Sequence, residues 1–248
     1  RGVTPGDLFH ASRRIVHPAP RAGAWLLVSP SRLPKAPRRA VARTAPVPCD
    51  APISDPTEVA DGCLRAVQRS LGFCLDYDPD TIPLLDHYLS LLADRPRAAT
   101  RDPVRGLVAT MAGAYFGEVV RRQYPCRWVV PPGSHPLDWR IEFTYWLLTF
   151  HPVAVAWEVI LRRDVPAGGA AFLMDEPTRV QIAERLDVLP GATLDDYFTF
   201  AQRLETLALT VGWLAERQAR EVERSGRPPV EVPAGRYATF LSKLKEDG

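Results

Sequence analysis

The sequence predicts an α+β fold, with a small antiparallel sheet of about three to four strands flanked by several helices. Residues 126–150 contain three strand-like segments with a turn-rich stretch among them. On both sides of this region, apolar residues recur at helical spacing and capping residues precede the periodic stretches. Strands gathered in one region, with helices before and after it, are typical of the α+β class.

Residues 1–48 differ in composition from the rest of the chain. They hold eight prolines and nine Lys/Arg against one acidic residue, Asp7, although the 248-residue chain has a net charge of only +2. This composition predicts a basic, Pro-rich, disordered segment, followed by a single α+β domain over residues 49–248 that is helical from about 176 to 245. We expect nucleic-acid binding only if segment 1–48 is functional.

The predicted domain begins with a helix over residues 55–71. Asp55 has the features of an N-cap, because a proline follows it and Glu58 lies three residues later. Residues 73–78 (FCLDYD) alternate apolar and polar side chains, which predicts a short strand. A second helix is predicted over residues 81–94, because leucines recur there at helical spacing and form its inner face.

A third helix is predicted over residues 102–124, and it contains a stripe of small residues. Gly113 and Gly117 are four apart on this stripe. Glycine inside a helix costs about 1 kcal/mol relative to alanine, so we expect both to be structural residues where another element packs closely.

Glu118 is the carboxylate of this helix, and the sequence allows three interpretations of it. It can pair with Arg122 at one solvated edge of the helix, since i,i+4 pairs share a face. It can be buried and hydrogen-bonded to the adjoining sheet. It can also act in catalysis with His135 or His151, if the fold brings either histidine within reach.

Three strands of the sheet are predicted, over residues 126–130, 138–143 and 144–150. In DWRIEF (138–143) the charged residues alternate with apolar ones, which predicts one solvated face. TYWLLTF (144–150) is apolar on both faces and predicts a central strand. His151-Pro152 then opens a helix to about residue 163.

The remainder is predicted to be helical. PTRVQIAERL forms one helix, and a long helix runs over about 193–223 from a capping box at Thr193. The predicted inner face of the long helix comprises Tyr197, Ala201, Leu204, Ala208 and Val211. RYATFLSKLK forms a short terminal helix.

Trp128, Trp139 and Trp146 are candidate ligand-binding residues, with packing in the core as the alternative interpretation. DYDPD (76–80) departs from a calcium loop, because Thr81 and His87 stand where Gly and Glu are needed. The four cysteines form neither a CxxC pair nor a zinc-type cluster. We therefore predict no metal and no cofactor.

Residues 143–161 are apolar, but His151, Pro152 and Glu158 make a membrane span costly, and no secretory signal is visible. Cysteines scattered singly are typical of a reducing compartment. We therefore expect a soluble, cytoplasmic protein.

GAYFGEVVRR (113–122), the strand bearing Trp128 and the helix HPVAVAWEV together resemble a family of uncharacterised bacterial domains. That family combines a GAYxGEV helix, a strand with Trp and a helix after an HP or NP step. The resemblance covers roughly residues 105–162. It implies a bacterial α+β domain and assigns neither an activity nor catalytic residues.

Three functions follow from these observations. The first is a non-enzymatic module of adaptor or immunity type that binds another protein, which the lack of a familiar catalytic motif favours. The second is a small-ligand binder with a Trp-lined pocket. The third is an enzyme that uses Glu118 with His135 or His151.

Overall fold

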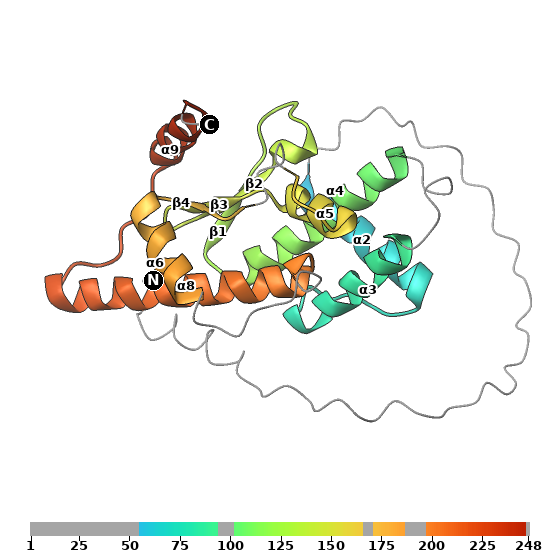
Figure 1. Cartoon of the computed structure of the whole chain (residues 1–248), viewed down its shortest axis with the longest axis horizontal. Coiled ribbons are helices and arrows are strands. Elements are labelled where there is room, and N and C mark those ends of the chain that lie inside the picture. Colours follow the sequence, from blue (N-terminus) through green and yellow to red (C-terminus); the bar gives the residue numbers. More distant parts are fainter. Residues whose placement is uncertain (1–54, 94–101, 166–170, 187–196, 247–248) are drawn as a thin grey trace, which may run out of the picture.

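The computed structural model describes residues 55–93, 102–165, 171–186 and 197–246 (Figure 1). These residues form seven α-helices and one four-stranded sheet, so the α+β prediction is confirmed. The helices are α2 (Pro56–Leu71), α3 (Ile82–Ala93), α4 (Asp102–Gln123), α5 (Pro152–Leu161), α6 (Glu176–Leu186), α8 (Phe200–Ser225) and α9 (Ala234–Glu246). The strands are β1 (Cys126–Val129), β2 (Arg140–Phe143), β3 (Leu148–Phe150) and β4 (Leu173–Met174). Two 3₁₀ turns, η1 (Pro79–Thr81) and η3 (Pro136–Asp138), precede α3 and β2.

The sheet is antiparallel throughout and follows the chain in the order β1-β2-β3-β4. Its register opposes Trp128 to Ile141 and Ile141 to Phe150. Helix α5 is inserted between β3 and β4 and packs on α4.

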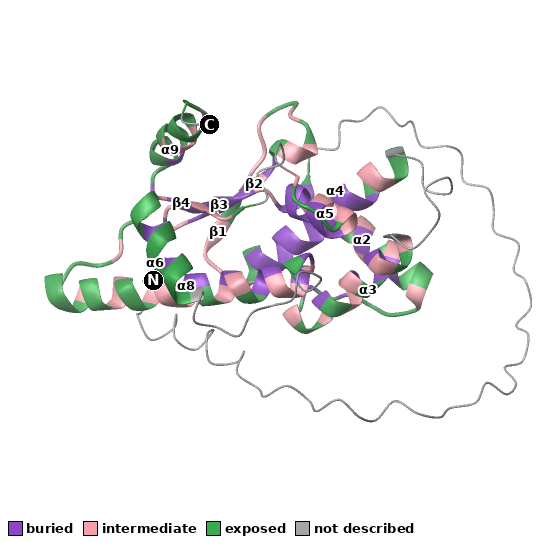
Figure 2. Cartoon of the chain, viewed as in Figure 1, coloured by how far each residue is buried: buried purple, intermediate pink, exposed green. Residues whose placement is uncertain are grey.

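Helix α4 is the centre of the molecule, and Figure 2 shows buried residues concentrated on it and on α5. Every residue from 112 to 120 is buried, so this part of the helix is enclosed on all sides. A helix surrounded in this way needs apolar residues around its whole circumference, and the sequence AGAYFGEVV meets this requirement at all but one position.

Two glycines make this enclosure possible. A Cβ atom on Gly113 would lie 2.5 Å from the Cα of Val153 and 2.7 Å from the carbonyl oxygen of Pro152, which are backbone atoms of α5. A Cβ atom on Gly117 would lie 2.3 Å from the indole ring of Trp128. The predicted close approach is therefore to the backbone of α5 at Gly113 and to the indole ring of Trp128 at Gly117.

The prediction of a strand at 73–78 is wrong. Tyr77 has φ +67°, in the left-handed region, which breaks an extended chain. Its backbone N–H donates to the hydroxyl of Tyr115 on α4, 3.0 Å away. Aspartates 76 and 78 accept hydrogen bonds from backbone N–H groups two residues further on, which forms turns that lead into η1.

The central strand predicted over 144–150 is shorter than expected, because residues 144–147 form a bend and only Leu148–Phe150 pair in the sheet. The hydroxyl of Tyr237, from α9, lies 2.8 Å from the carbonyl oxygen of Phe143 and 2.7 Å from that of Trp146. It also accepts a hydrogen bond from Leu148 N–H. A side chain about ninety residues away thus takes the place of a strand partner.

Helix α8 begins at Phe200 rather than at residue 193. Thr199 caps it through its side chain, and the carboxylate of Asp86 on α3 accepts from the N–H groups of Phe200 and Ala201. Tyr197, predicted on the inner face, precedes the helix and is 41% exposed. The capping box from Thr193 to Asp196, like segment 1–48, lies outside the described residues.

Within the described part of the chain, none of the helices combines the length and the apolar character that crossing a bilayer requires. The buried faces of α4 and α5 are instead covered by the sheet and by neighbouring helices.

Candidate functional site

Glu118 is fully buried, at 0% exposure, so the interpretation that placed it at a solvated edge of α4 is wrong. Arg121 donates to both carboxylate oxygens at 2.8 Å, and the indole Nε1 of Trp128 donates to Oε1 at 2.7 Å. Arg122 is a more distant ion-pair partner at 3.8 Å. The carboxylate therefore joins α4 to strand β1.

The electrostatics of Glu118 follow from these contacts. Burial alone would raise its pKa, but the hydrogen bonds from Arg121 and Trp128 outweigh burial and hold the pKa below its usual value. The group is therefore an ionised carboxylate with strong donors on both oxygens. Such a group favours a structural role over proton transfer, because a general base needs a pKa near the working pH.

Two other buried glutamates are neutralised in the same way. Glu142 on β2 accepts from Arg127 at 2.9 Å and from Arg140 at 3.0 Å. It was predicted on a solvated face, yet it is buried beneath these two arginines. On α5, Glu158 accepts from Arg203 at 2.7 Å.

The two candidate histidines occupy capping positions. His135 accepts through Nδ1 from Leu137 N–H at 3.2 Å and so caps η3. His151 is the N-cap residue of α5, and its carbonyl oxygen accepts from Ala154 N–H and Val155 N–H. Among the described contacts, the carboxylate of Glu118 is held by arginines and a tryptophan, with neither histidine among its partners.

Sequence reasoning missed a second polar cluster beside Glu118. The guanidinium of Arg122 lies 3.7 Å above the ring of Tyr77, whose hydroxyl donates to Asp61 at 2.6 Å. The unusual backbone of Tyr77 turns its side chain into this arrangement. The local sequence signal for it was weak, because DYDPD indicates turns without showing which helix they contact.

The three candidate tryptophans lie in two places. Trp128 and Trp139 pack edge to face, with their ring centroids 6.5 Å apart, and Trp139 is fully buried. These contacts support the interpretation of both as core residues. Trp146 lies elsewhere, in the bend after β2, where it is buried against Phe143 and also borders a cleft.

This cleft has a volume of about 260 Å³ and is formed by four segments that are distant in sequence. They are the 145–147 bend, the start of α6, the middle of α8 and the segment 230–236 that leads into α9. Its charged lining residues are Asp175, Arg217, Glu231 and Arg236. No pattern in the sequence indicates that these four segments lie together.

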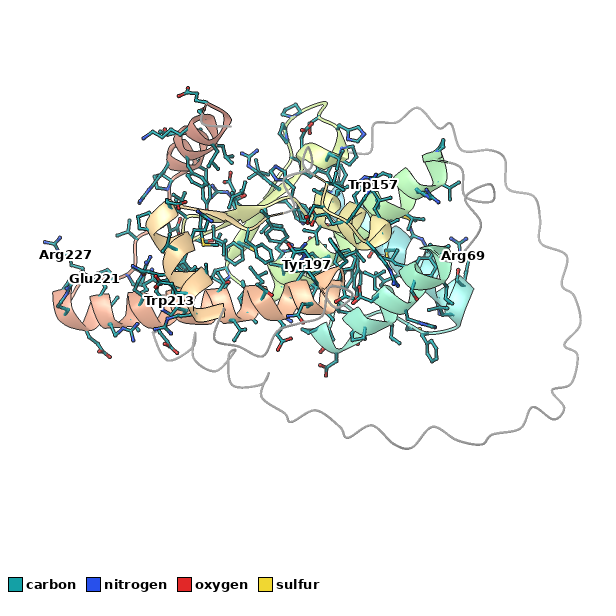
Figure 3. All side chains as sticks on the ribbon, in the orientation of Figure 1. Arg69, Trp157, Tyr197, Trp213, Glu221 and Arg227 are labelled. Atoms are coloured by element: carbon teal, nitrogen blue, oxygen red, sulfur yellow. The ribbon has the colours of Figure 1, made fainter. Side chains whose placement is uncertain are left out.

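Trp213 lies on α8 beside α6 (Figure 3). The guanidinium groups of Arg185 and Arg217 lie 5.6 and 4.8 Å from its ring centroid. Arg217 also donates to the hydroxyl of Thr178 at 3.3 Å. These contacts hold Arg217 at the edge of the cleft.

Among the residues that the structure describes, no group of three or more His, Cys, Asp or Glu side chains is arranged to hold a metal ion. Comparison with models of protein families, with curated proteins and with solved structures finds no significant match to this chain. The resemblance to the GAYxGEV domain family therefore stays a prediction.

Proposed function

We propose that this chain is a non-enzymatic bacterial module of adaptor or immunity type that binds another protein in the cytoplasm. The observation that carries this proposal is the apolar stripe of α9, whose C-terminal part the described residues leave only partly covered. Free thiols at Cys63, Cys74 and Cys126 are compatible with a reducing compartment.

Helix α9 has helical apolar spacing without the burial that usually accompanies it. Tyr237, Phe240, Leu241 and Leu244 recur at i, i+3, i+4 and i+7, which places them on one face. Tyr237 is fully buried, Phe240 and Leu241 are half-buried, and Leu244 is 41% exposed. Figures 1 and 2 show this helix at the periphery, with most of its surface exposed.

An amphipathic helix of this kind fits a groove on a second protein, where residues at i, i+3, i+4 and i+7 serve as anchors. The sequence of α9 also carries Arg236, Lys243 and Lys245 against one acid, Glu246. The partner that fits this surface is a protein with an apolar groove and an acidic rim, because charge complementarity guides such encounters.

The enzyme hypothesis has less support. Its best residue, Glu118, has hydrogen-bond donors on both oxygens, and the three buried glutamates 118, 142 and 158 are all paired with arginines. A specific observation favours the small-ligand hypothesis, because Trp146 lines a cleft, and the two binding roles can coexist in one chain.

The test is to place a photoreactive amino acid at position 244 and irradiate cells of the source organism. The partner captured by the crosslink is identified and purified in its unmodified form. It is then mixed with the purified full chain, and the complex is measured by sedimentation. We expect a complex of fixed stoichiometry that Leu244→Asp weakens by at least about tenfold, since losing a buried leucine contact is worth roughly 1.5–3 kcal/mol.

The matched control is Leu209→Asp on α8, because Leu209 is similarly exposed at 45% but lies on another helix. This variant should bind as well as the unmodified chain. If Leu244→Asp binds equally well, or if no partner of fixed stoichiometry forms in the source cells, the proposal is overturned.

A further inference from the structure

We propose that the cleft between α6, α8 and segment 230–236 binds a small organic molecule that carries a carboxylate or phosphate group on an aromatic or apolar body. This site reaches α9 at Arg236, but the apolar stripe of α9 does not line it, and the proposal stands whether or not that stripe binds a protein. It rests on two arginines, an aromatic bend and the arrangement of the nearby acids.

Arg217 and Arg236 both line the cleft, and neither forms an ion pair with a described residue. Other described arginines, among them Arg65, Arg105 and Arg220, also form no ion pair with a described residue, so Arg217 and Arg236 are distinguished by lining the same cleft. Guanidinium groups bind carboxylate and phosphate through two parallel hydrogen bonds. Two such groups at one cleft, without an acid partner, are therefore suited to an anionic ligand.

The two acids of the cleft do not cancel this preference. One carboxylate oxygen of Asp175 accepts from Thr178 N–H at 3.1 Å, so this side chain caps the N-terminus of α6, which compensates its charge. Arg217 is directed to the Thr178 hydroxyl and to the Trp213 ring instead. Glu231 is exposed and forms no ion pair with any described residue, so its charge opposes an anion at the cleft, but solvent and salt screen it.

Apolar side chains form part of the remaining lining and can contact an apolar group of the ligand, while polar atoms form most of the exposed wall. Tyr145, Trp146, Leu147, Leu214 and Val232 contribute aromatic and aliphatic surface. The indole Nε1 of Trp146, a residue that lines the cleft, is buried and has no hydrogen-bond partner among the described residues. A volume of about 260 Å³ lies just below the usual range of roughly 300–1,000 Å³ for ligand pockets, which limits the ligand to a small molecule.

The test is calorimetric titration of the full chain with benzoate and with benzamide, which share shape and ring but differ in charge. Phenyl phosphate and inorganic phosphate form a second pair that separates the contribution of the ring from that of the anion. We expect benzoate to bind at least tenfold more tightly than benzamide, and phenyl phosphate at least tenfold more tightly than inorganic phosphate. If only benzoate binds more tightly than benzamide the site takes carboxylates, and if only phenyl phosphate binds more tightly than benzamide it takes phosphates.

Arg236→Gln tests the site directly, because Arg236 is exposed and no described side-chain contact holds it. It should weaken binding of the preferred anion at least tenfold. Arg217→Lys should weaken it less than Arg217→Gln, and thermal melting of each variant shows whether the fold is retained. Arg227→Gln, just beyond α8 at its far end (Figure 3), should leave binding unchanged.

Two results would overturn the proposal. One is that neither benzoate nor phenyl phosphate binds more tightly than benzamide, or that the unmodified chain and Arg236→Gln bind the preferred anion equally. The other is the absence of binding by every probe at concentrations up to about 10 mM, which corresponds to an affinity too weak to matter.

Discussion

Helices α4 and α9 are held to the molecule in opposite ways. Helix α4 approaches α5 so closely at Gly113 that a single added carbon would meet backbone atoms, and Glu118 fixes its far half to β1. Helix α9 is anchored through one buried side chain, Tyr237, while its other apolar residues are half-buried or exposed. Stability is therefore concentrated at α4, whereas α9 keeps part of its apolar surface exposed.

The glycines of α4 differ from those of α8 and α9 in how closely other atoms approach them. Gly113 and Gly117 on α4 have neighbours within 2.3–2.7 Å of an added Cβ, but Gly212 on α8 has nothing within 4 Å. Gly235 on α9 is equally open. Close packing requires glycine at positions 113 and 117 of α4. At Gly212 and Gly235 glycine only weakens the helix relative to alanine.

The largest expected effect is that of Gly113→Ala. Because Val153 Cα and Pro152 O belong to the backbone, the neighbours cannot give way by a rotamer change, and we expect a loss of at least about 3 kcal/mol of unfolding free energy. Gly117→Leu should also destabilise the fold severely, since Trp128 is held by Glu118. Denaturant unfolding measures both losses.

Gly212→Ala is the matched control for these substitutions, because it makes the same change in a helix with open space around it. It should raise the unfolding free energy by up to about 1 kcal/mol, from helix propensity alone. An unchanged melting midpoint for Gly113→Ala would show that α4 and α5 can separate, and the contrast between the regions would be lost.

A second prediction concerns the junction between α3 and α8. Burial raises the pKa of Asp86 to about 6 from its ordinary value of 3.8, although hydrogen bonds from Phe200 and Ala201 oppose the shift. The folded state thus holds this proton more tightly than the unfolded chain does. The contribution of Asp86 to stability is therefore largest below about pH 4 and is lost as the pH rises through about 6.

The shift is about two pKa units, which corresponds to roughly 3 kcal/mol. The stability of the unmodified chain relative to Asp86→Asn should fall by up to this amount between about pH 4 and pH 7. Measuring both proteins by denaturant unfolding cancels the groups that they share. A difference in stability that is independent of pH would refute the assignment.

The smallest expected loss of global stability is that of Tyr237→Phe. The variant keeps the buried ring but removes the donor that reaches the carbonyl oxygens of Phe143 and Trp146, which costs about 1–2 kcal/mol. Hydrogen exchange should accelerate in α9 and in residues 143–148 while α4 remains protected. Equal acceleration in both helices would mean that α9 is part of the same cooperative unit as α4.

The sequence predicted the features that depend on local chemistry. The α+β class, the start of the first helix at Pro56 behind Asp55 and the close packing at the α4 glycines all follow from spacing and capping. These signals lie within a few residues of the features that they determine, so a single sequence is sufficient to read them.

The features that the sequence did not predict depend on distant partners. The bend at 144–147 is held by Tyr237, and the turn at Tyr77 is held by Tyr115. Glu118 pairs with Arg121 at i+3 and with an indole on β1, so its burial could not follow from its position on a helical wheel. The cleft was invisible for the same reason, since four separate segments form it.

The anchoring of Tyr237 also affects how this chain can be shortened. Gly226 ends α8 in a left-handed conformation, which makes it look like a natural domain boundary. A protein truncated there would lose the hydroxyl that the bend uses as its hydrogen-bond partner, together with Val232, whose N–H donates to Thr144 O. Tyr237 on α9 thus completes the hydrogen bonding of the bend that follows β2. A minimal folded fragment therefore has to extend past residue 237.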